Sequence, residues 1–594
     1  MFNMFKTKSR YNLILLFFML NISVFTILRL ILYIQSLTFI DKFFVYIPYI
    51  FGVGFFYDVI FNIYFNLFFA FILLIIPNKI YNSKPFAYIT YFFYVLFLFG
   101  FYFVVTSEWV FWDEFNTRFN FISVDYLIYS DEVINNIYES YPLGWIVTVI
   151  FFISLTTFIL LKAKLASILK IQESVKQRAL IFCGLCALSL FSCFFVGQTL
   201  RELSNNNYVN ELASNGPYQF IAALRNNTLD YKTFYAQGDD KKLSYILKSI
   251  IGKKPDDGGT YDISREIEPK DKSNYVNVIL ISVESLSAKY LTRFGSTENI
   301  TPFMDKWFKE GLLFTNFYAT GTRTDRGLES ITLSVPPTPG RSMVKRPDNA
   351  KIYSLGKVFK DNGYDVAFLY AGIGFFDNMN AFFSGNGYRI VDQMDFEDNE
   401  ITFQNAWGVS DEDLYNKAIK EANKSLDAKK PFFFHIMTTS NHRPYTYLDG
   451  KIDIPPGTGR AGAVKYTDYA LNQFIQNAKM QRWFDDTIFV IVADHCAGSA
   501  GKVGLPVEKY HIPLFIYSPK YITYGEISKV ASQIDIAPTV LALLNFNYKS
   551  YFFGSNILGD DFAERALIGN YQKLGLYKNN KDATVCRVPV DSTS

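Results

Sequence analysis

The sequence predicts two halves, an N-terminal all-α transmembrane domain of five helices and a C-terminal α/β domain with a mostly parallel central sheet. Nearly all the long apolar runs of the 594-residue chain lie before residue 200. After residue 276, short apolar runs alternate with helix-like segments, as in parallel α/β sheets. The second half also contains all four histidines, and we expect it to carry the chemistry: His435, His442, His495 and His511.

Composition excludes several classes of protein. Hydrophobic residues make up 50% of the chain, which argues against a disordered protein. The net charge is only +3, so the basic field typical of a nucleic-acid binder is missing and we expect no nucleic-acid partner. Five cysteines are too few for a disulfide scaffold. A single bridge between Cys496 and Cys586 stays open.

Five predominantly apolar runs are long enough to cross the roughly 30 Å hydrocarbon core of a membrane. We expect the second run to form one tilted helix with an interfacial stretch, because a turn inside it would leave two short helices. The runs lie at about 12–35, 48–76, 87–107, 143–162 and 179–199.

Loop charges predict the orientation of these spans. The N-terminus and the loop after the fourth span are basic, whereas segment 108–142 carries several acids against Arg118. We therefore expect a multi-pass protein of the cell (inner) membrane with a cytoplasmic N-terminus. An odd number of spans then places the residues after about 200 on the periplasmic or extracellular side. The aromatic-rich segment 108–142 is expected to form interfacial helices.

Two charged residues, Arg29 and Asp58, fall inside predicted spans. A charge at membrane depth is costly, so it usually has a partner or a function. We expect Arg29 to reach toward the interface and to pair with Asp58. A role in holding a lipid headgroup is the alternative.

The chain is predicted to divide at two boundaries. Residues 1–200 form the five-span domain, residues 201–273 a helical linker, and residues 274–594 the α/β domain. The linker prediction depends on Asn-rich and Gly-rich breaks and on a charged stretch with Pro255 and Pro269. Five runs after it read as buried strands: Val276–Val283, Val366–Tyr370, Phe432–Met437, Ile488–Ala493 and Pro513–Tyr517.

Polar residues follow three of these strands. Glu284 comes after the first, His442 a few residues after the third, and Asp494 with His495 after the fourth. The carboxyl ends of parallel strands meet at one edge of a sheet, so these side chains are expected to converge. Carboxylate and imidazole groups suit Mn²⁺, Zn²⁺ or Mg²⁺. In isolation, each would more often be a turn, a cap or a solvent-facing residue.

A candidate nucleophile lies in the Thr/Gly/Arg-rich stretch 319–327, which precedes a helix-like run. Hydroxyl groups at a helix N-terminus beside cations are well placed to meet an anionic substrate. A simple threonine N-cap is the alternative reading.

Several blocks in order resemble the lipoteichoic acid synthase and phosphoglycerol transferase family, the membrane-anchored branch of the alkaline-phosphatase/sulfatase superfamily. The resemblance covers nearly the whole chain and implies that residues 274–594 are an extracytoplasmic, sulfatase-like catalytic domain. The blocks are Ile279–Ser285, Thr320–Thr324, Ser440–Tyr445, Ala493–His495, Arg118–Tyr126, and Trp407-Gly408 followed by Asp411–Asp413.

The resemblance implies a metal-dependent phosphoglycerol transferase. Glu284, Thr324, Asp494 and His495 would bind one divalent metal, with Mn²⁺ first and Mg²⁺ or Zn²⁺ as alternatives. Thr324 would attack phosphatidylglycerol and form a covalent phosphoglycerol-threonine. A glycan or a polyglycerolphosphate chain of the envelope would then accept the group, and His442 would contact it.

The sequence departs from the polymerases of this family, where a His and a Trp-Asn-Arg stretch after one strand help to bind substrate. Tyr370 takes the place of that His here, and we expect Arg326 and His511 to supply some phosphate contacts. A phosphoethanolamine transferase is the first alternative function, and a non-catalytic membrane-anchored binding protein the second. A sulfatase is disfavoured because Thr324 stands where that chemistry needs a modified Cys or Ser.

Overall fold

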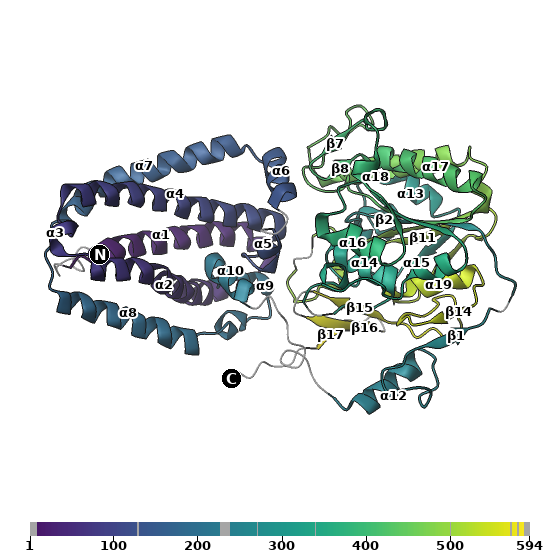
Figure 1. Cartoon of the computed structure of the whole chain (residues 1–594), viewed down its shortest axis with the longest axis horizontal. Coiled ribbons are helices and arrows are strands. Elements are labelled where there is room, and N and C mark those ends of the chain that lie inside the picture. The colour runs from purple at the N-terminus through teal and green to yellow at the C-terminus, as the bar shows by residue number, and fades with distance from the viewer. Residues whose placement is uncertain are drawn as a thin grey trace.

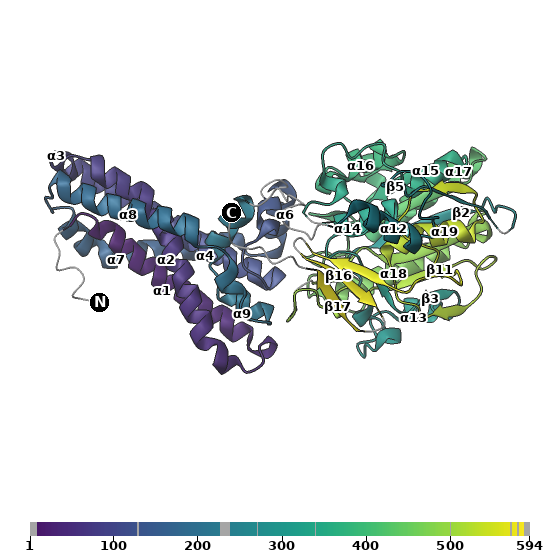
Figure 2. The same ribbon diagram turned by 90° about the horizontal axis from the view of Figure 1, so that it is seen from below.

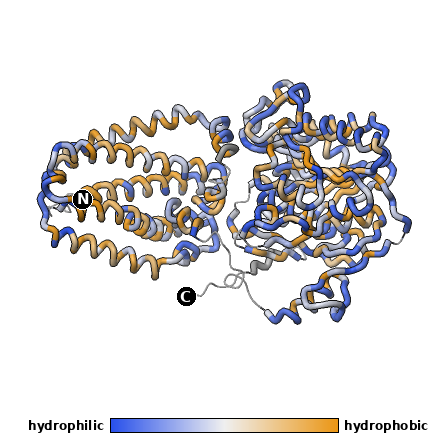
Figure 3. Tube along the Cα trace, in the orientation of Figure 1, coloured by the Kyte–Doolittle hydropathy of each residue, from blue (hydrophilic) through white to orange (hydrophobic). Residues whose placement is uncertain are grey.

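The computed structural model describes residues 9–126, 130–225, 238–269, 271–338, 340–498, 501–570, 573–578 and 581–586. Figures 1 and 2 show a bundle of long helices beside a larger α/β domain, as the sequence predicts. Apolar residues occur along the long helices of the bundle, whereas in the α/β domain they are concentrated in the interior (Figure 3).

Five helices of the described chain are long and apolar enough to cross a membrane. The second is one continuous helix, as expected, and contains Pro48 in its second turn. The third runs past the predicted end of its span at residue 107 and includes part of the expected interfacial segment. These helices are α1 (Asn12–Gln35), α2 (Phe43–Ile75), α4 (Lys84–Phe115), α7 (Leu143–Ile168) and α8 (Val175–Phe195).

A buried ion pair joins two of these helices. Arg29 of α1 and Asp58 of α2 form a two-bond pair with both N–O distances at 2.8 Å, which confirms the predicted pairing. Arg29 also donates to the carbonyl oxygens of Leu212 and Ser214, at the end of α9 (Asn207–Leu212). Gly54 is required beside the pair, because a Cβ there would lie 2.2 Å from the guanidinium. The pair therefore fixes the segment after the last span to the bundle.

Short helices connect the bundle to the α/β domain. Helices α5 and α6 fall inside segment 108–142, where the sequence predicted interfacial helices. In its described residues, the predicted linker 201–273 contains three α-helices and a short strand. The shorter helices of this half are α3 (Asn78–Tyr81), α5 (Phe121–Asp125), α6 (Ser130–Ser140), α10 (Gly216–Arg225) and α12 (Asp240–Ile250).

An eight-stranded mixed sheet forms the centre of the α/β domain, in the order β12-β3-β11-β10-β2-β9-β5-β6. Its central strands are buried at every position, which explains their continuous apolar sequences. All neighbours pair in parallel except β11, which runs antiparallel to both of its neighbours. The strands are β2 (Asn277–Val283), β3 (Leu312–Phe314), β5 (Asp365–Tyr370), β6 (Arg389–Val391), β9 (Phe432–Met437), β10 (Thr487–Ala493), β11 (Leu514–Tyr517) and β12 (Gly525–Ile527).

Helices cover the sheet in two groups. Figure 1 shows α13, α17 and α18 on one side of it and α14, α15, α16 and α19 on the other. The five strands predicted from the sequence match β2, β5, β9, β10 and β11, and the predicted fold class is confirmed. These helices are α13 (Pro302–Trp307), α14 (Thr324–Leu333), α15 (Leu355–Asp361), α16 (Met379–Gly385), α17 (Asp411–Asp427), α18 (Arg460–Ala478) and α19 (Ile536–Leu543).

Four smaller sheets complete the domain. In one of them, β1 of the predicted linker pairs antiparallel with β14, so the end of the linker is attached to the α/β domain. The small sheets are β1 (Arg265–Ile267) with β14 (Tyr548–Ser550), β4 (Phe317–Tyr318) with β13 (Ala531–Ser532), β7 (Gln404–Asn405) with β8 (Gly408–Val409), and β15 (Ala566–Gly569) with β16 (Leu574–Lys578) and β17 (Lys581–Cys586).

Candidate active site

Glu284 lies at the carboxyl end of β2, the central strand of the large sheet. Its backbone N–H donates to Thr438 Oγ1 at 3.0 Å, beyond the end of the neighbouring β9. The hydroxyl of Ser285 donates to its carboxylate. Burial alone would raise the pKa of Glu284, but His442 and His495 in their protonated forms and the hydrogen bond from Ser285 lower it. Glu284 is therefore held as a carboxylate inside the domain.

Asp494 and His495 follow β10, the parallel neighbour of β2. Oδ1 of Asp494 accepts hydrogen bonds from the N–H groups of Ser285 and His495, at 2.8 and 2.7 Å. Burial and the charge of Glu284 raise the pKa of Asp494 well above its ordinary value. His495 has its Nδ1 2.8 Å from the carbonyl oxygen of Cys496, to which it donates, so its Nε2 presents a lone pair to the two carboxylates.

Glu284, Asp494 and His495 form a cluster whose ligand atoms all lie within 4.8 Å of one another. The residues fit a divalent metal for two reasons. Oδ2 of Asp494 is buried without a hydrogen-bond partner, which is costly unless a cation is nearby. Two buried carboxylates this close together also repel each other unless a positive charge separates them. Two carboxylates and an imidazole suit Mn²⁺, Mg²⁺ or Zn²⁺.

Thr324 is the first residue of α14 and places its hydroxyl at this cluster. Its Oγ1 donates to Glu284 Oε2 at 3.2 Å and lies 3.5 Å from His495 Nε2. The close approach of the helix requires Gly327, because a Cβ there would lie 2.2 Å from the carbonyl oxygen of Asp494. The four residues that the sequence singled out as metal ligands and nucleophile therefore lie together, at the N-terminus of a helix.

Gln533 connects the nucleophile loop to the end of β10, and sequence reasoning missed it. Its side-chain amide donates to the carbonyl oxygens of Ala493 and Asp494, at 2.9 and 2.6 Å. Its carbonyl oxygen accepts from the N–H and the hydroxyl of Thr320. One buried amide thus sets the spacing between the loop and the metal-ligand cluster. No local sequence signal marks it, because its partners are more than 35 residues away in the chain.

His442 reaches the cluster from the loop after β9. Its Nε2 lies 3.2 Å from Glu284 Oε1, and its side chain is partly exposed. Burial lowers the pKa of His442. The ring stacks on the indole of Trp407. Trp407 belonged to a block of the family resemblance, but the sequence assigned it no contact with the site.

Arg326 points away from the cluster, toward the segment after α14. Its guanidinium pairs with Glu329 at 2.8 Å and donates to Thr338 Oγ1 and to the carbonyl oxygen of Gly340. It borders a cavity of about 30 Å³, which is also lined by three further cations, Arg323, Arg341 and Lys345, and by the carboxylate of Asp325. The expected contact between Arg326 and a substrate phosphate stays a prediction. Such a contact would be made from the wall of this cavity.

His511 lies apart from the cluster in the described structure. Its Nε2 donates to the carbonyl oxygen of Thr315 at 2.9 Å, and its ring stacks on Tyr318. Its backbone carbonyl accepts from the thiol of Cys496. Cys496 is a free, buried cysteine. A substrate contact by His511 stays a prediction that none of these interactions supports.

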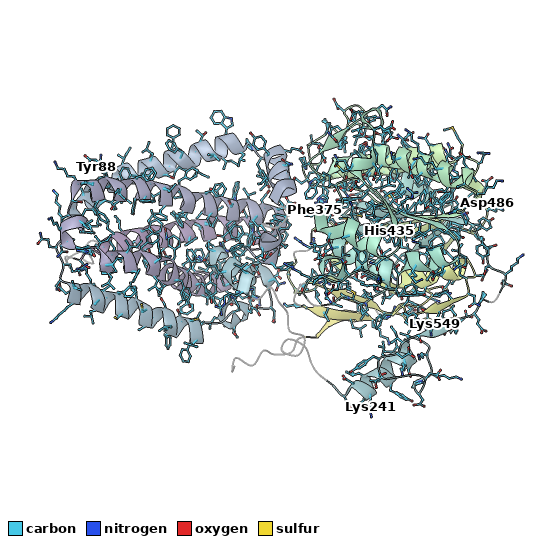
Figure 4. All side chains as sticks on the ribbon, in the orientation of Figure 1. Tyr88, Lys241, Phe375, His435, Asp486 and Lys549 are labelled. Carbon is cyan, nitrogen blue, oxygen red and sulfur yellow. The ribbon has the colours of Figure 1, made fainter. Side chains whose placement is uncertain are left out.

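The site edge of the α/β domain also contacts the helical bundle. Arg443, the residue after His442, forms ion pairs with Asp113 and Glu114 at the end of α4, at 3.3 and 2.6 Å. Its Nη1 also donates to Tyr141 Oη at 2.7 Å. Figure 4 shows His435 inside the domain and Phe375 on the edge that faces the helices. The loop that carries His442 and Arg443 therefore lies against the helical bundle.

Comparison with known proteins agrees with this fold. Residues 276–546 match the sulfatase family. A solved structure of an alkaline phosphatase superfamily protein from Vibrio parahaemolyticus is 34% identical, with a TM-score of 0.57, over 61% of this chain and 89% of that one. The chain therefore belongs to the alkaline phosphatase superfamily, and its α/β domain is a sulfatase-family domain.

The curated relatives narrow the resemblance within this superfamily. Lipoteichoic acid synthase 2 of Bacillus subtilis is 26% identical, over 49% of this chain and 48% of the relative. Phosphoglycerol transferase I of Xanthomonas campestris is 23% identical, over 54% of this chain and 47% of the relative. The chain thus spans about half the length of these two relatives. These matches confirm the resemblance to lipoteichoic acid synthases and phosphoglycerol transferases that the sequence predicts.

Proposed function

We propose that the protein is a membrane-anchored, metal-dependent phosphoglycerol transferase. It would move glycerol phosphate from phosphatidylglycerol to a hydroxyl of an envelope glycan or of a polyglycerolphosphate chain. The observation that carries the proposal is the position of Thr324 Oγ1, 3.2 Å from Glu284 at the edge of the metal-ligand cluster. The names of the curated relatives support the choice of transferred group.

The reaction divides into two displacements at phosphorus. Thr324 Oγ1 attacks the phosphodiester, loses its proton and bonds to phosphorus, while the bond from phosphorus to the diacylglycerol oxygen breaks and that oxygen takes up a proton. An acceptor hydroxyl then attacks the phosphoglycerol-threonine, loses its proton and releases Thr324 as the free hydroxyl. Glu284 Oε2, the acceptor of the Thr324 hydrogen bond, orients the nucleophile for the first step.

The proposed metal ligands are Glu284, Thr324, Asp494 and His495, with Mn²⁺ as the first choice and Mg²⁺ or Zn²⁺ as alternatives. When bound, such a cation lowers the pKa of a ligated hydroxyl and neutralises charge on phosphoryl oxygens. Arg323 and Arg341, which line the small cavity, add positive charge near Thr324 and favour an anionic substrate there. Lys345 also lines the cavity but is paired with Asp325 and Asp377. His442, partly exposed at the cluster, is placed to contact the glycerol phosphate.

The membrane setting completes the proposal. With the N-terminus in the cytoplasm and five spans, the catalytic domain faces the periplasm or the cell exterior, where the acceptors occur. Its active-site edge meets the bundle through Arg443, which pairs with Asp113 and Glu114. Anchoring the site at the membrane raises the effective concentration of a lipid donor.

A direct test uses the purified full-length protein with Mn²⁺ and a fluorescent phosphatidylglycerol in mixed micelles. Release of fluorescent diacylglycerol is expected from the wild type and not from Thr324→Ala. Equal release by both proteins would overturn Thr324 as the nucleophile. The same assay with phosphatidylethanolamine tests the alternative donor, and release from that lipid alone would identify a phosphoethanolamine transferase. Metal binding without release from either lipid would favour the binding-protein alternative.

A further inference from the structure

A groove lies at the corner between α6 and α7, outside the α/β domain. Its volume is about 650 Å³, and it is open to its surroundings rather than enclosed. Tyr138 and Tyr141 line it from the end of α6 and the turn, and Leu143, Trp145 and Thr148 from the first turns of α7. Helix α7 is one of the five helices able to cross a membrane, so the groove lies at the boundary where a span begins.

The lining suits the region of a phospholipid between headgroup and acyl chains. Tyr138 and Trp145 are 72% and 75% exposed, which is unusual for large aromatic rings facing water but typical of rings at a membrane interface. Their rings offer apolar faces to acyl chains. The hydroxyls of Tyr138 and Tyr141 offer hydrogen bonds to the ester groups of a lipid, whereas the hydroxyl of Thr148 already donates to the carbonyl oxygen of Gly144.

The groove is connected to the candidate active site by direct contacts. Tyr141, in the groove wall, accepts a hydrogen bond from Arg443, the residue after His442. His442 in turn lies 3.2 Å from Glu284 of the metal-ligand cluster. A lipid held in the groove would thus lie beside the loop that reaches the metal ligands.

The facing edge of the catalytic domain is apolar as well. Phe375, which is 71% exposed, lies on the edge turned toward the helices in Figure 4. It belongs to the loop after β5, at the carboxyl end of the sheet where the site lies. Its neighbour Ile373 is also exposed. Exposed apolar side chains on this edge favour a lipid, rather than a soluble molecule, as the occupant of the groove.

We propose that the α6–α7 groove binds the diacylglycerol part of one phospholipid from the leaflet that faces the catalytic domain, and that it presents this lipid to the active site. The proposal rests on the proposed function in one respect: the lipid bound there is the donor. The groove supplies affinity for the part of the donor that does not react, and the catalytic domain handles only the headgroup.

The test compares two tryptophan substitutions on the same helix. Thr148→Trp fills the groove, whereas Leu160→Trp adds the same side chain at an exposed position farther along α7. Native mass spectrometry of the full-length protein, purified in detergent, counts the phospholipids retained per chain. One retained phospholipid is expected for the wild type and Leu160→Trp, and none for Thr148→Trp. Equal retention by all three proteins would overturn the proposal that the groove binds a phospholipid.

A kinetic comparison tests whether the retained lipid is the donor. Thr148→Trp is expected to raise KM for long-chain phosphatidylglycerol about tenfold, since excluding even two methylene groups from an apolar site has an effect of this size. Its kcat/KM for a dibutanoyl phosphatidylglycerol should match the wild type, because short chains do not fill the groove. An equal loss with both donors would contradict the proposal. A wild type without activity on either donor would refute the proposed function. The number of phospholipids retained per chain would still show whether the groove binds a lipid.

Discussion

The imidazole of His442 and the indole of Trp407 are stacked, with ring centroids 4.1 Å apart and planes inclined by 14°. Trp407 comes from the turn between β7 and β8 and is almost fully buried. Its Nε1 donates to the carbonyl oxygen of Arg443 at 2.6 Å. Trp407 therefore sets both the plane of the His442 ring and the backbone that follows it, and so aims Nε2 at Glu284.

Loss of this stacking is expected to weaken substrate contact without loss of metal. Trp407→Ala should lower kcat/KM for diacylglycerol release about 10- to 100-fold, because His442 would lose its fixed orientation. Trp407→Phe keeps an aromatic face but loses the hydrogen bond to Arg443, so a smaller decrease is expected. Metal content, measured by elemental analysis, should be unchanged in both variants. Wild-type kinetics in Trp407→Ala would show that the stack has no role in transfer.

The hydroxyl of residue 324 is expected to be essential. Thr324→Ala should lower the transfer rate by at least about a thousandfold, as removal of a nucleophile does in other enzymes. Thr324→Ser keeps a hydroxyl at the N-terminus of α14 and should retain part of the activity. Mass spectrometry of acid-quenched wild type should find phosphoglycerol on the peptide that contains Thr324. A modified peptide elsewhere in the chain would contradict the assignment.

Metal binding is expected to stabilise the catalytic domain, because it relieves the repulsion between Glu284 and Asp494. A cation at 100 times its Kd adds about 2.7 kcal/mol to the free energy of unfolding. Thermal unfolding should therefore occur at a lower temperature with a chelator and recover with added Mn²⁺. Asp494→Asn removes a ligand charge and should abolish most of this shift. A chelator effect of the same size in Asp494→Asn would place the metal elsewhere.

The fold was largely predictable because its main elements have continuous, unambiguous patterns. Four adjacent strands at the centre of the sheet, β2, β9, β10 and β11, are apolar at nearly every position, because both of their faces are buried. The direction of β11 was not predictable, since antiparallel pairing with β10 depends on the path of the chain around the domain. The extension of α4 to Phe115 was also missed, because the acids at its end are typical of a loop until Arg443 is seen to pair with them.

The grouping of Glu284, Asp494 and His495 was predictable because Glu284 and Asp494 directly follow strands, where the topology alone brings them together. The residues that position the cluster were not. Gln533 acts through hydrogen bonds to backbone groups far away in the chain, and such contacts leave no mark in a local pattern. His511 was expected to supply a phosphate contact; its ring lies against Tyr318, and that contact stays a prediction.

The stability of the catalytic domain is expected to fall between about pH 4 and pH 7 because of Asp468. This side chain of α18 accepts hydrogen bonds from the N–H groups of Phe303 and Met304, and burial raises its pKa from 3.8 to about 7. The folded state thus binds the proton more tightly than the unfolded chain. The stabilisation is complete below the unfolded pKa and is lost as the pH rises through the folded pKa, by up to about 4 kcal/mol.

Asp468→Asn isolates this contribution, because an amide does not titrate. Urea unfolding of the full-length protein in detergent, measured at about pH 4 and pH 7, gives the change in unfolding free energy for each protein. The wild type should lose more stability over this interval than Asp468→Asn. Identical losses in the two proteins would exclude Asp468 as the titrating group.

Removal of one charge from the buried pair of the bundle should be strongly destabilising. Asp58→Asn leaves the guanidinium of Arg29 buried with only the carbonyl oxygens of Leu212 and Ser214 and a neutral amide as partners. Breaking a buried ion pair from one side costs about 3–5 kcal/mol, whereas replacing both members with apolar residues is often neutral. The midpoint of thermal unfolding in detergent should thus fall in Asp58→Asn and recover largely in Arg29→Met/Asp58→Leu. If the double variant unfolds as early as Asp58→Asn, the bundle requires the charged pair itself and the attachment of α9 that Arg29 provides. An unchanged midpoint in Asp58→Asn would show that the pair does not stabilise the bundle.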